Sequence, residues 1–273
     1  MPAPPRGNAR VACQILHEDG AFVALMKLAG QVTQPGAGHR DDSLLNGLFA
    51  RDAVTQTRLG SERDWGLLHR LDRETSGIVL VARTREAYDS IRAQFEARTV
   101  EKTYLAALEG RLPSVQGVCT RALKEVRRGE MKVSALVVRG EEARTHWRVL
   151  GKSGTHLAVA CAIETGRLHQ IRAHMASLGA PVVGDRIYRP LLPPNTSARS
   201  SGGEPTLRLH AWRIAFAHPT TGARVELEAG LPVRMIEALN ASCNSAKASL
   251  GVAIERELEG VRQPNWWKVG AKR

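Results

Sequence analysis

Residues 69–82, HRLDRETSGIVLVA, combine a polar segment with an apolar run that follows it directly. A continuous apolar run between turn-forming residues is typical of a buried strand. A loop held in front of such a strand is a common place for catalytic side chains. In this loop Asp72 lies between Arg70 and Arg73, and nearby guanidinium groups favour the ionised carboxylate of a nucleophile or general base. The same residues also fit a structural turn, in which Asp72 or Thr75 caps backbone amides.

Strands and helices surround this stretch without a regular βαβ order. Residues 13–35 predict two strands joined by a turn, and Thr84 is placed to cap a helix. The clearest helical periodicity covers residues 166–178. Further strands are expected at residues 103–110, 145–150, 155–164, 207–216 and 223–227, a loop at 189–206 and a closing helix at 234–250. This order predicts an α+β fold with a mixed or largely antiparallel sheet.

The chain of 273 residues is basic, with 39 Lys and Arg, 27 Asp and Glu, and a net charge of +12. Such an excess of cations favours a polyanionic partner, most commonly nucleic acid, although a solvated basic surface has the same composition. Residues 121–144 are strongly basic and fit either a hairpin or a mobile loop. The cysteines form no CxxC pair, and no apolar stretch suits a signal peptide or a membrane span. These features fit a reducing cytoplasm.

The segment from His69 to Gly77 resembles the signature of the RluA family of RNA pseudouridine synthases. The matching residues are His69, Arg70, Leu71, Asp72, Thr75, Ser76 and Gly77. At about 5% usage for each residue type, such a match arises by chance in roughly one window in 10⁹. Other segments resemble the family's remaining motifs in the family's order, namely residues 15–19, 27–30, 102–104, 164–174, 184–185 and 207–211. Two features depart from the pattern, Leu28 in place of the usual proline and the Pro-rich loop 189–206.

This resemblance implies the pseudouridine synthase fold, with a central bent sheet, mixed or antiparallel, and a catalytic cleft. It also implies the reaction: the N1–C1′ bond of a uridine in RNA breaks, the uracil rotates, and C5 bonds to C1′. Asp72 would be the essential carboxylate, either attacking C1′ or removing the C2′ proton on a glycal route. Arg172 would pair with Asp72, because a guanidinium can hold a carboxylate bidentately. Tyr104 would stack on the target base, and we expect neither a cofactor nor a metal.

The target uridine must leave its stack to reach such a site, so the resemblance also implies base flipping. His69 and Arg70 would support the flipped nucleotide or brace the loop. Thr75 and Lys102 would bind substrate, and Leu209 would form an apolar pocket wall. Cations of residues 121–144 would contact phosphates, which positions RNA without reading its sequence. We expect this role above all for Arg127, Arg128 and Lys132; a solvated loop is the alternative.

Three rival functions fit parts of the sequence. His169 and His174 suggest a metal site, but their i,i+5 spacing places them poorly on one helical face. A glycosidase would need a second carboxylate, for which Asp185 is the best candidate. A non-catalytic RNA-binding protein or RNA chaperone on the same fold is the third, and the intact set of Asp72, Tyr104 and Arg172 disfavours it. A related subfamily, the RsuA-like synthases, tends to have glycine where His69 stands, so this residue disfavours membership of that subfamily.

The sequence suggests three segments: a mobile tail over 1–10, a catalytic domain over 11–250 and a C-terminal extension over 251–273. We expect no N-terminal RNA-binding module of the S4 type. Trp266 and Trp267 in the extension could stack on bases or pack on the parent domain. The expected partner is ribosomal or transfer RNA, bound by a monomer without a membrane or metal.

Overall fold

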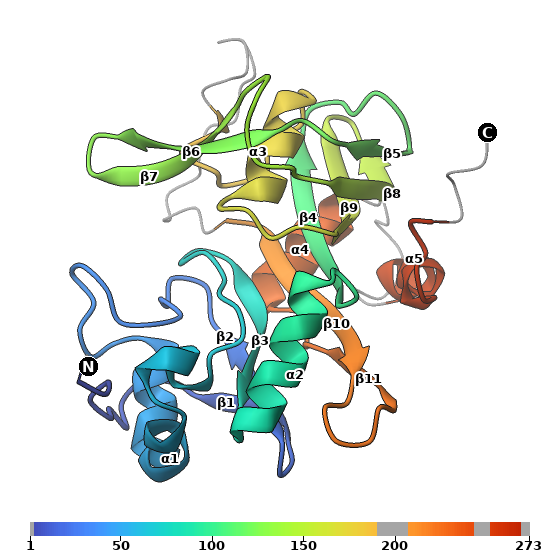
Figure 1. The fold of residues 1–273 in the computed structure, drawn as a ribbon. Coiled ribbons are helices and arrows are strands. Elements are labelled where there is room, and N and C mark those ends of the chain that lie inside the picture. The colour runs from blue at the N-terminus through green and yellow to red at the C-terminus, as the bar shows by residue number, and fades with distance from the viewer. Residues whose placement is uncertain (1–2, 190–206, 243–251, 269–273) are drawn as a thin grey trace. The chain divides into compact units, whose positions relative to one another are not determined.

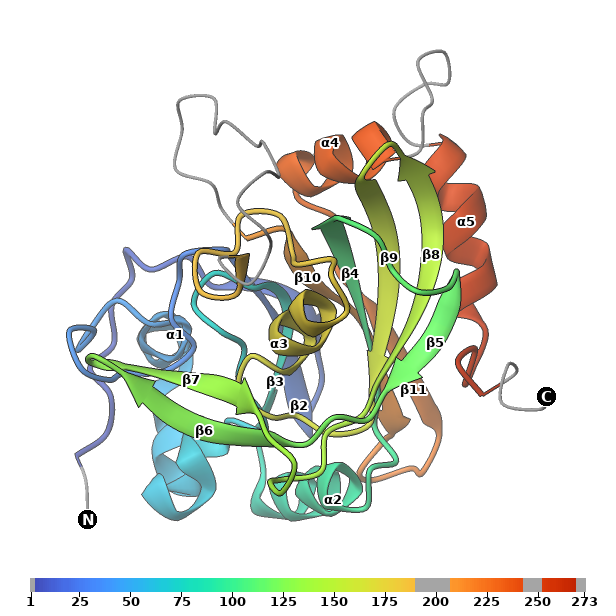
Figure 2. The ribbon, with the colours of Figure 1, turned by 90° about the horizontal axis from the view of Figure 1, so that it is seen from above.

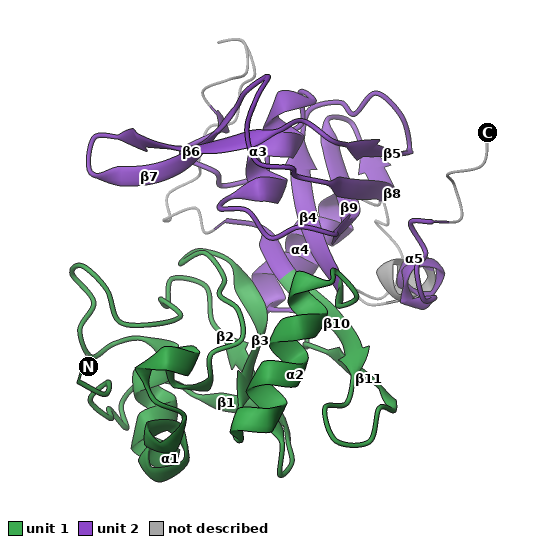
Figure 3. Ribbon diagram, in the orientation of Figure 1, with its two compact units in different colours: residues 1–101, 211–230 green, residues 102–210, 231–273 purple. Residues whose placement is uncertain are grey.

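The computed structural model describes residues 3–189, 207–242 and 252–268, and its chain forms two compact units (Figure 3). Unit 1 comprises residues 1–101 and 211–230, and unit 2 comprises residues 102–210 and 231–273. Both units combine strands with helices (Figure 1), so the α+β prediction is confirmed. The three segments suggested by the sequence stay a prediction.

Unit 1 is built on a sheet in which β1 pairs with β2, β2 with β3, and β10 with β11, each pair antiparallel, while β10 lies next to β3. The strands are β1 (Gln14–Glu18), β2 (Phe22–Lys27), β3 (Ser76–Ala82), β10 (Leu209–Ala217), whose first two residues are assigned to unit 2, and β11 (Arg224–Glu228). The helices are α1 (Leu44–Leu59), the 3-10 helix η1 (Ser61–Gly66) and α2 (Arg85–Glu96). Every residue of β2 and β3 is buried, as the apolar run of β3 predicts.

Helix α2 begins as the sequence predicts, because the Thr84 hydroxyl accepts a hydrogen bond from the amide of Ala87 at 3.1 Å. Its buried residues Ala87 and Ile91 join one core cluster with Leu80 of β3 and Ile214 of β10. This packing fixes β3, the strand that directly follows the Asp72 loop.

The strands of unit 2 follow the order β4, β9, β8, β5, with each neighbouring pair antiparallel (Figure 2). These strands are β4 (Glu101–Glu109), β5 (Gln116–Cys119), β8 (Thr145–Ser153) and β9 (His156–Ile163). The helices are α3 (Gln170–Ser177), α4 (Val233–Ser242) and α5 (Val252–Arg262). Alternate residues of β9, including Val159 and Cys161, share a core cluster with Ile171 and Met175 of α3. Helices α4 and α5 contact the same sheet at β8.

For the basic residues 121–144 the sequence allowed either a hairpin or a mobile loop. The structure shows a hairpin of β6 (Leu123–Arg128) and β7 (Met131–Leu136). Its base is tied down by Ser134, whose amide donates to Tyr188 Oη at 2.9 Å and whose carbonyl accepts from the same hydroxyl at 3.0 Å. The rest of the hairpin extends outward in Figure 1 with its cations exposed. A rigid base with exposed cations suits contact with a polyanion.

One helix prediction needs correction, and another is only partly covered by the described residues. The helix expected over 166–178 begins only at Gln170, because His169 adopts the left-handed conformation with φ 51°. Gln170 Oε1 then accepts from the amide of Arg167 at 3.1 Å, which closes a turn before the helix. The closing helix expected over 234–250 is α4, which ends at Ser242, and residues 243–250 lie outside the described part. The loop expected over 189–206 lies outside it too, apart from Arg189.

Of the two alternatives for Trp266, stacking on bases and packing on the parent domain, the structure shows the second, because Trp266 packs against β4 within unit 2. Its side chain is buried, and its indole Nε1 donates to Thr103 Oγ1 of β4 at 3.3 Å. Among the described helices, none combines the length and the apolar character that crossing a membrane requires.

Candidate active site on the Asp72 loop

The residues just before Asp72 are fixed to unit 1 from both sides. Thr33 Oγ1 donates to the carbonyl of Leu71 at 2.9 Å and accepts from the amide of Leu71 at 3.2 Å. His69 Nε2 accepts from the amide of Leu80 in β3 at 3.1 Å. Asp72 itself is half-buried, and its carbonyl accepts from the amide of Thr75 at 3.1 Å, which closes the turn. A half-buried carboxylate on a loop held at several points is preorganised for chemistry.

The last residue of the signature must be a glycine for steric reasons. Gly77 has φ +123°, and a Cβ at this position would lie 2.2 Å from the carbonyl oxygen of Ala211 in β10. A side chain cannot fit there, so glycine allows β3 and β10 to approach each other directly behind the loop. Thr75, two residues earlier, is buried, and its Oγ1 has no hydrogen-bond partner among the described residues. This hydroxyl therefore does not make the amide cap that the structural reading of the loop requires of Thr75.

Lys27 lies beneath the loop and is fully buried at the end of β2. Its ammonium donates to the carbonyls of Leu28 at 3.0 Å, Gln31 at 2.6 Å and Arg73 at 2.9 Å. Burial lowers the pKa of Lys27 to about 7, and the carboxylate of Asp72 opposes this shift. Lys27 thus connects two loops and places a titratable cation near Asp72. The sequence signal for this role is a lysine that ends an otherwise apolar strand, FVALMK.

We expect the free energy of unfolding to rise with pH between about 7 and 10.5 because of Lys27. Its pKa is about 7 in the folded chain, whereas the ordinary value for lysine is 10.5, so the unfolded chain binds more protons in this window. One proton difference contributes at most about 1.4 kcal/mol per pH unit. Urea unfolding across this window should show the rise in wild type and a smaller rise in Lys27→Met. The exposed Lys132→Met is the matched control and should behave as wild type; an equal rise in Lys27→Met would contradict the assignment.

The two basic neighbours of Asp72 and the preceding histidine have different surroundings. The His69 ring packs on Phe95 of α2 with ring centroids 5.2 Å apart, so His69 braces the loop, one of the two roles expected for it. Arg73 Nε donates to the Gly30 carbonyl at 3.0 Å, and the Gly30 amide donates back to the Arg73 carbonyl at 2.9 Å. Arg70 is exposed. It is therefore accessible to a ligand in solution.

Arg172 belongs to unit 2, where it forms a buried bidentate ion pair. Its Nε and Nη2 donate to Asp185 at 2.8 Å and 3.2 Å, and the Tyr188 ring lies under its guanidinium at 5.5 Å. Asp185 Oδ1 also accepts from the amides of Ile187 and Tyr188. Arg172 is thus an inward-facing, preorganised cation rather than a surface arginine. The pairing of Arg172 with Asp72 stays a prediction.

These contacts bear on two of the rival functions. Asp185, the second carboxylate that a glycosidase would need, is completely enclosed and holds Arg172. His174, one of the two suggested metal ligands, has Nδ1 at 2.9 Å from Thr145 Oγ1 and Nε2 at 2.9 Å from the Arg121 carbonyl. Both of its ring nitrogens are therefore engaged by protein oxygens. Burial lowers the pKa of His174, which favours the neutral ring in this structural role.

The remaining expected site residues also lie in unit 2. Tyr104 and Lys102 are half-buried on β4, where Tyr104 is opposite Cys161 of β9. Leu209 is buried in the core cluster that contains Val159, so it contributes to packing. On the hairpin, Arg127 is opposite Lys132, and the Lys132 ammonium pairs with Glu125 at 2.7 Å. Arg128, opposite Met131, is exposed as well. The substrate contacts of these residues stay predictions.

The chain is similar in sequence to known proteins. A family model described as RNA pseudouridylate synthase matches residues 21–177, a range that contains the Asp72 loop, β4 and α3. "Ribosomal large subunit pseudouridine synthase D" of Nitrosomonas europaea is 36% identical over 242 residues, which cover 88% of this chain and 68% of that protein. The protein of the same name from Xanthomonas campestris is 36% identical over 227 residues, covering 81% and 67%.

Solved structures show the same fold. "Human RNA Pseudouridylate Synthase Domain Containing 1" aligns with a TM-score of 0.68 at 24% identity, covering 93% of this chain and 96% of that one. "Human RNA Pseudouridylate Synthase Domain Containing 4" aligns with a TM-score of 0.64 at 22% identity, covering 84% and 92%. At these identities the likeness concerns the fold, whereas the family model and the bacterial relatives carry the assignment. The chain belongs to the RNA pseudouridylate synthase family, in its RluA branch, and is an isomerase that acts on RNA.

Proposed function

We propose that the chain converts uridine to pseudouridine in large-subunit ribosomal RNA and that Asp72 is its catalytic carboxylate. The observation that carries the assignment of Asp72 is its place on a loop held by Thr33, Lys27 and His69 directly before a buried strand. The choice of ribosomal RNA rests on relatives such as the Nitrosomonas europaea protein, whose name states that substrate. Transfer RNA is the alternative substrate.

The reaction needs only the groups proposed for the site. The N1–C1′ bond breaks and leaves its electron pair on N1, the uracil turns, C5 bonds to C1′, and the ring is restored when C5 loses its proton and N1 takes one up. Asp72 either attacks C1′ and is later displaced, or it removes the C2′ proton and later returns it. Both routes require an ionised carboxylate beside the ribose. No electron or phosphoryl group is transferred in either route.

Arg172 and Tyr104 would complete the site. A guanidinium already oriented by Asp185 can hold Asp72 without a further loss of side-chain entropy, because its rotamer is fixed. Tyr104 would stack on the flipped uracil with its ring and offer its hydroxyl to the moving proton. The Thr75 hydroxyl is buried and lacks a partner among the described residues, so it would act on the substrate through an enclosed water molecule. The hairpin cations Arg127 and Arg128 would hold phosphates.

The setting of the enzyme is also part of the proposal. We place it in the cytoplasm as a monomer. The described cysteines Cys13, Cys119 and Cys161 are free thiols, which is the usual state in a reducing compartment.

Site-resolved pseudouridine mapping of total RNA tests this proposal. The comparison uses the wild-type strain, a deletion strain, and the deletion strain complemented with either wild type or Asp72→Asn. We expect one or a few sites in large-subunit RNA to be lost on deletion and restored only by the wild-type protein. Lost sites confined to transfer RNA would reject the ribosomal substrate and keep the activity. No lost site, with RNA binding intact, would favour the non-catalytic RNA-binding protein.

A further inference from the structure

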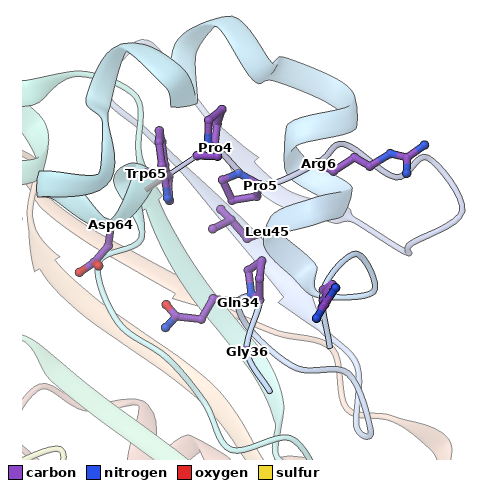
Figure 4. A pocket seen from close by; sticks show the side chains of 11 residues that line it. Pro4, Pro5, Arg6, Gln34, Gly36, Leu45, Asp64 and Trp65 are labelled. Atoms are coloured by element: carbon purple, nitrogen blue, oxygen red, sulfur yellow. The ribbon is translucent and has the colours of Figure 1, made fainter. Parts of the chain in front are cut away.

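Unit 1 contains a pocket of about 340 Å³ that lies beside the loop supporting Asp72 (Figure 4). Its walls come from the N-terminal segment, the loop after β2, the start of α1, and η1. Gln34, which lines it, directly follows Thr33, the residue that holds Leu71. The volume lies at the small end of the range of roughly 300–1,000 Å³ that ligand pockets occupy. The pocket therefore has room for a small group, close in the chain to the catalytic loop.

One wall of the pocket is the indole of Trp65, held by an unusual turn. Asp64 and Trp65 both adopt left-handed conformations, with φ 46° and 55°, which non-glycine residues rarely do. The amide of Trp65 donates to the Gly60 carbonyl at 2.9 Å, and its ring meets the edge of Phe49 at 5.9 Å. The side chain is only half-buried. Strained backbone that presents a partly exposed aromatic ring is typical of a binding site rather than of core packing.

Two arginines lie at the pocket with their backbones fixed by one buried amide. Asn46 Nδ2 donates to the carbonyl of Arg6 at 2.7 Å and to that of Arg40 at 3.3 Å. Both arginine side chains are exposed, and neither forms an ion pair within the described residues. Exposed guanidinium groups that line a pocket suit the phosphates of a polyanion.

One side of the pocket is polar. Figure 4 shows Trp65, Pro4 and Leu45 close together, with Gln34 extending toward the side where Asp64 lies. The Gln34 amide has no hydrogen-bond partner among the described residues, so it offers both donors and an acceptor. The Asp64 carboxylate is exposed and accepts hydrogen bonds. Such a pair can bond the edge of a nucleobase, which carries N–H and C=O groups.

We propose that this pocket binds one unpaired nucleotide of the RNA substrate at a point separate from the target uridine. The base stacks on Trp65 and directs its edge to Gln34 and Asp64, while Arg6 and Arg40 hold the adjoining phosphates. Stacking on an aromatic ring combined with cations along the backbone is the general mode of binding single-stranded nucleic acid. The proposal rests on the substrate being RNA, and it adds an anchor outside the site of chemistry.

Binding and chemistry are measured separately to test it. The probes are a labelled oligouridine single strand and a blunt RNA duplex of equal length, and the rate is measured in a single turnover at saturating substrate RNA. We expect Trp65→Leu to weaken oligouridine binding by about 10-fold, whereas Trp65→Phe stays close to wild type because its ring can still stack. Duplex binding and the saturated rate should be unchanged. If the wild-type protein is inactive, the proposed function is rejected, but the binding measurement still tests the pocket because it does not depend on catalysis.

The arginines provide a second, independent measurement. Arg6→Gln combined with Arg40→Gln should lower the slope of log Kd against log salt by about 1.4 for the single strand, the value for two lost phosphate contacts. Arg10→Gln combined with Arg58→Gln is the matched control, since both are exposed arginines of unit 1 that do not line the pocket. Should Trp65→Leu fail to fold, this comparison decides. Equal slopes in the two double variants, or equal loss of duplex and single-strand binding in Trp65→Leu, would overturn the proposal.

Discussion

Asp72→Asn should lower the rate of pseudouridine formation by at least about 10³-fold while the protein stays folded and binds RNA. Asparagine keeps the size and one oxygen of the side chain but can neither attack C1′ nor accept the C2′ proton. Loss of a positioned group of this kind costs up to about 10⁴-fold in general acid–base catalysis. The rate is measured by release of tritium from RNA that carries [5-³H]uridine, because C5 loses its hydrogen on either route.

The matched control is Glu74→Gln, a carboxylate two residues further along the same loop. The Glu74 side chain is 43% exposed and pairs with Arg73 at 3.7 Å, so its neutralisation should change the rate by no more than about threefold. Equal losses in Glu74→Gln and Asp72→Asn would mean that loop charge, not the Asp72 carboxylate, supports the reaction. A fully active Asp72→Asn would remove Asp72 from the mechanism.

Elements with a strong local signal could be predicted from the sequence. The run that forms β3 is apolar from Ile78 to Ala82, and Thr84 follows it as the cap of α2, so composition and spacing suffice there. Helix α1 was not predicted, because its buried residues gather in its first half and Asp52 breaks the helical backbone with φ −146°. The early start assigned to α3 has a similar cause. The left-handed His169 is set by its surroundings, and helical periodicity cannot reveal it.

The candidate site also contains residues with a strong local signal and residues whose role depends on tertiary structure. The residues around Asp72 form one contiguous signature, so the sequence could identify them together. Lys27 and Thr33 were missed because their bonds to the loop join residues 46 and 38 positions apart. The role suggested for Asp185 was that of a second catalytic carboxylate, whereas its bond to Arg172, 13 residues away, fixes the arginine. Such pairings follow from tertiary structure, and a pattern of neighbouring residues does not contain them.

Asp185→Asn should lower the free energy of unfolding by about 3–5 kcal/mol, because it leaves the guanidinium of Arg172 buried without its counterion. The side chains of Arg172 and Asp185 are 7% and 0% exposed, so water cannot replace the lost charge. Urea unfolding monitored by tryptophan fluorescence measures the change. Glu141→Gln is the control, since it neutralises a 58% exposed partner of Arg167 at 3.0 Å and should cost less than about 1 kcal/mol. Similar losses in both variants would mean that the buried pair of Arg172 and Asp185 contributes no more to stability than an exposed ion pair does.

The double variant Arg172→Met with Asp185→Asn separates the structural role of Arg172 from its proposed catalytic one. It leaves no unpaired charge buried, and the amide oxygen at position 185 can still accept from the amides of Ile187 and Tyr188, so the double variant should recover most of the stability lost in Asp185→Asn alone. If Arg172 orients Asp72 as proposed, tritium release should nevertheless stay far below that of wild type. A double variant that regains both stability and activity would show that Arg172 serves the fold alone, and that Asp72 needs no arginine for the reaction.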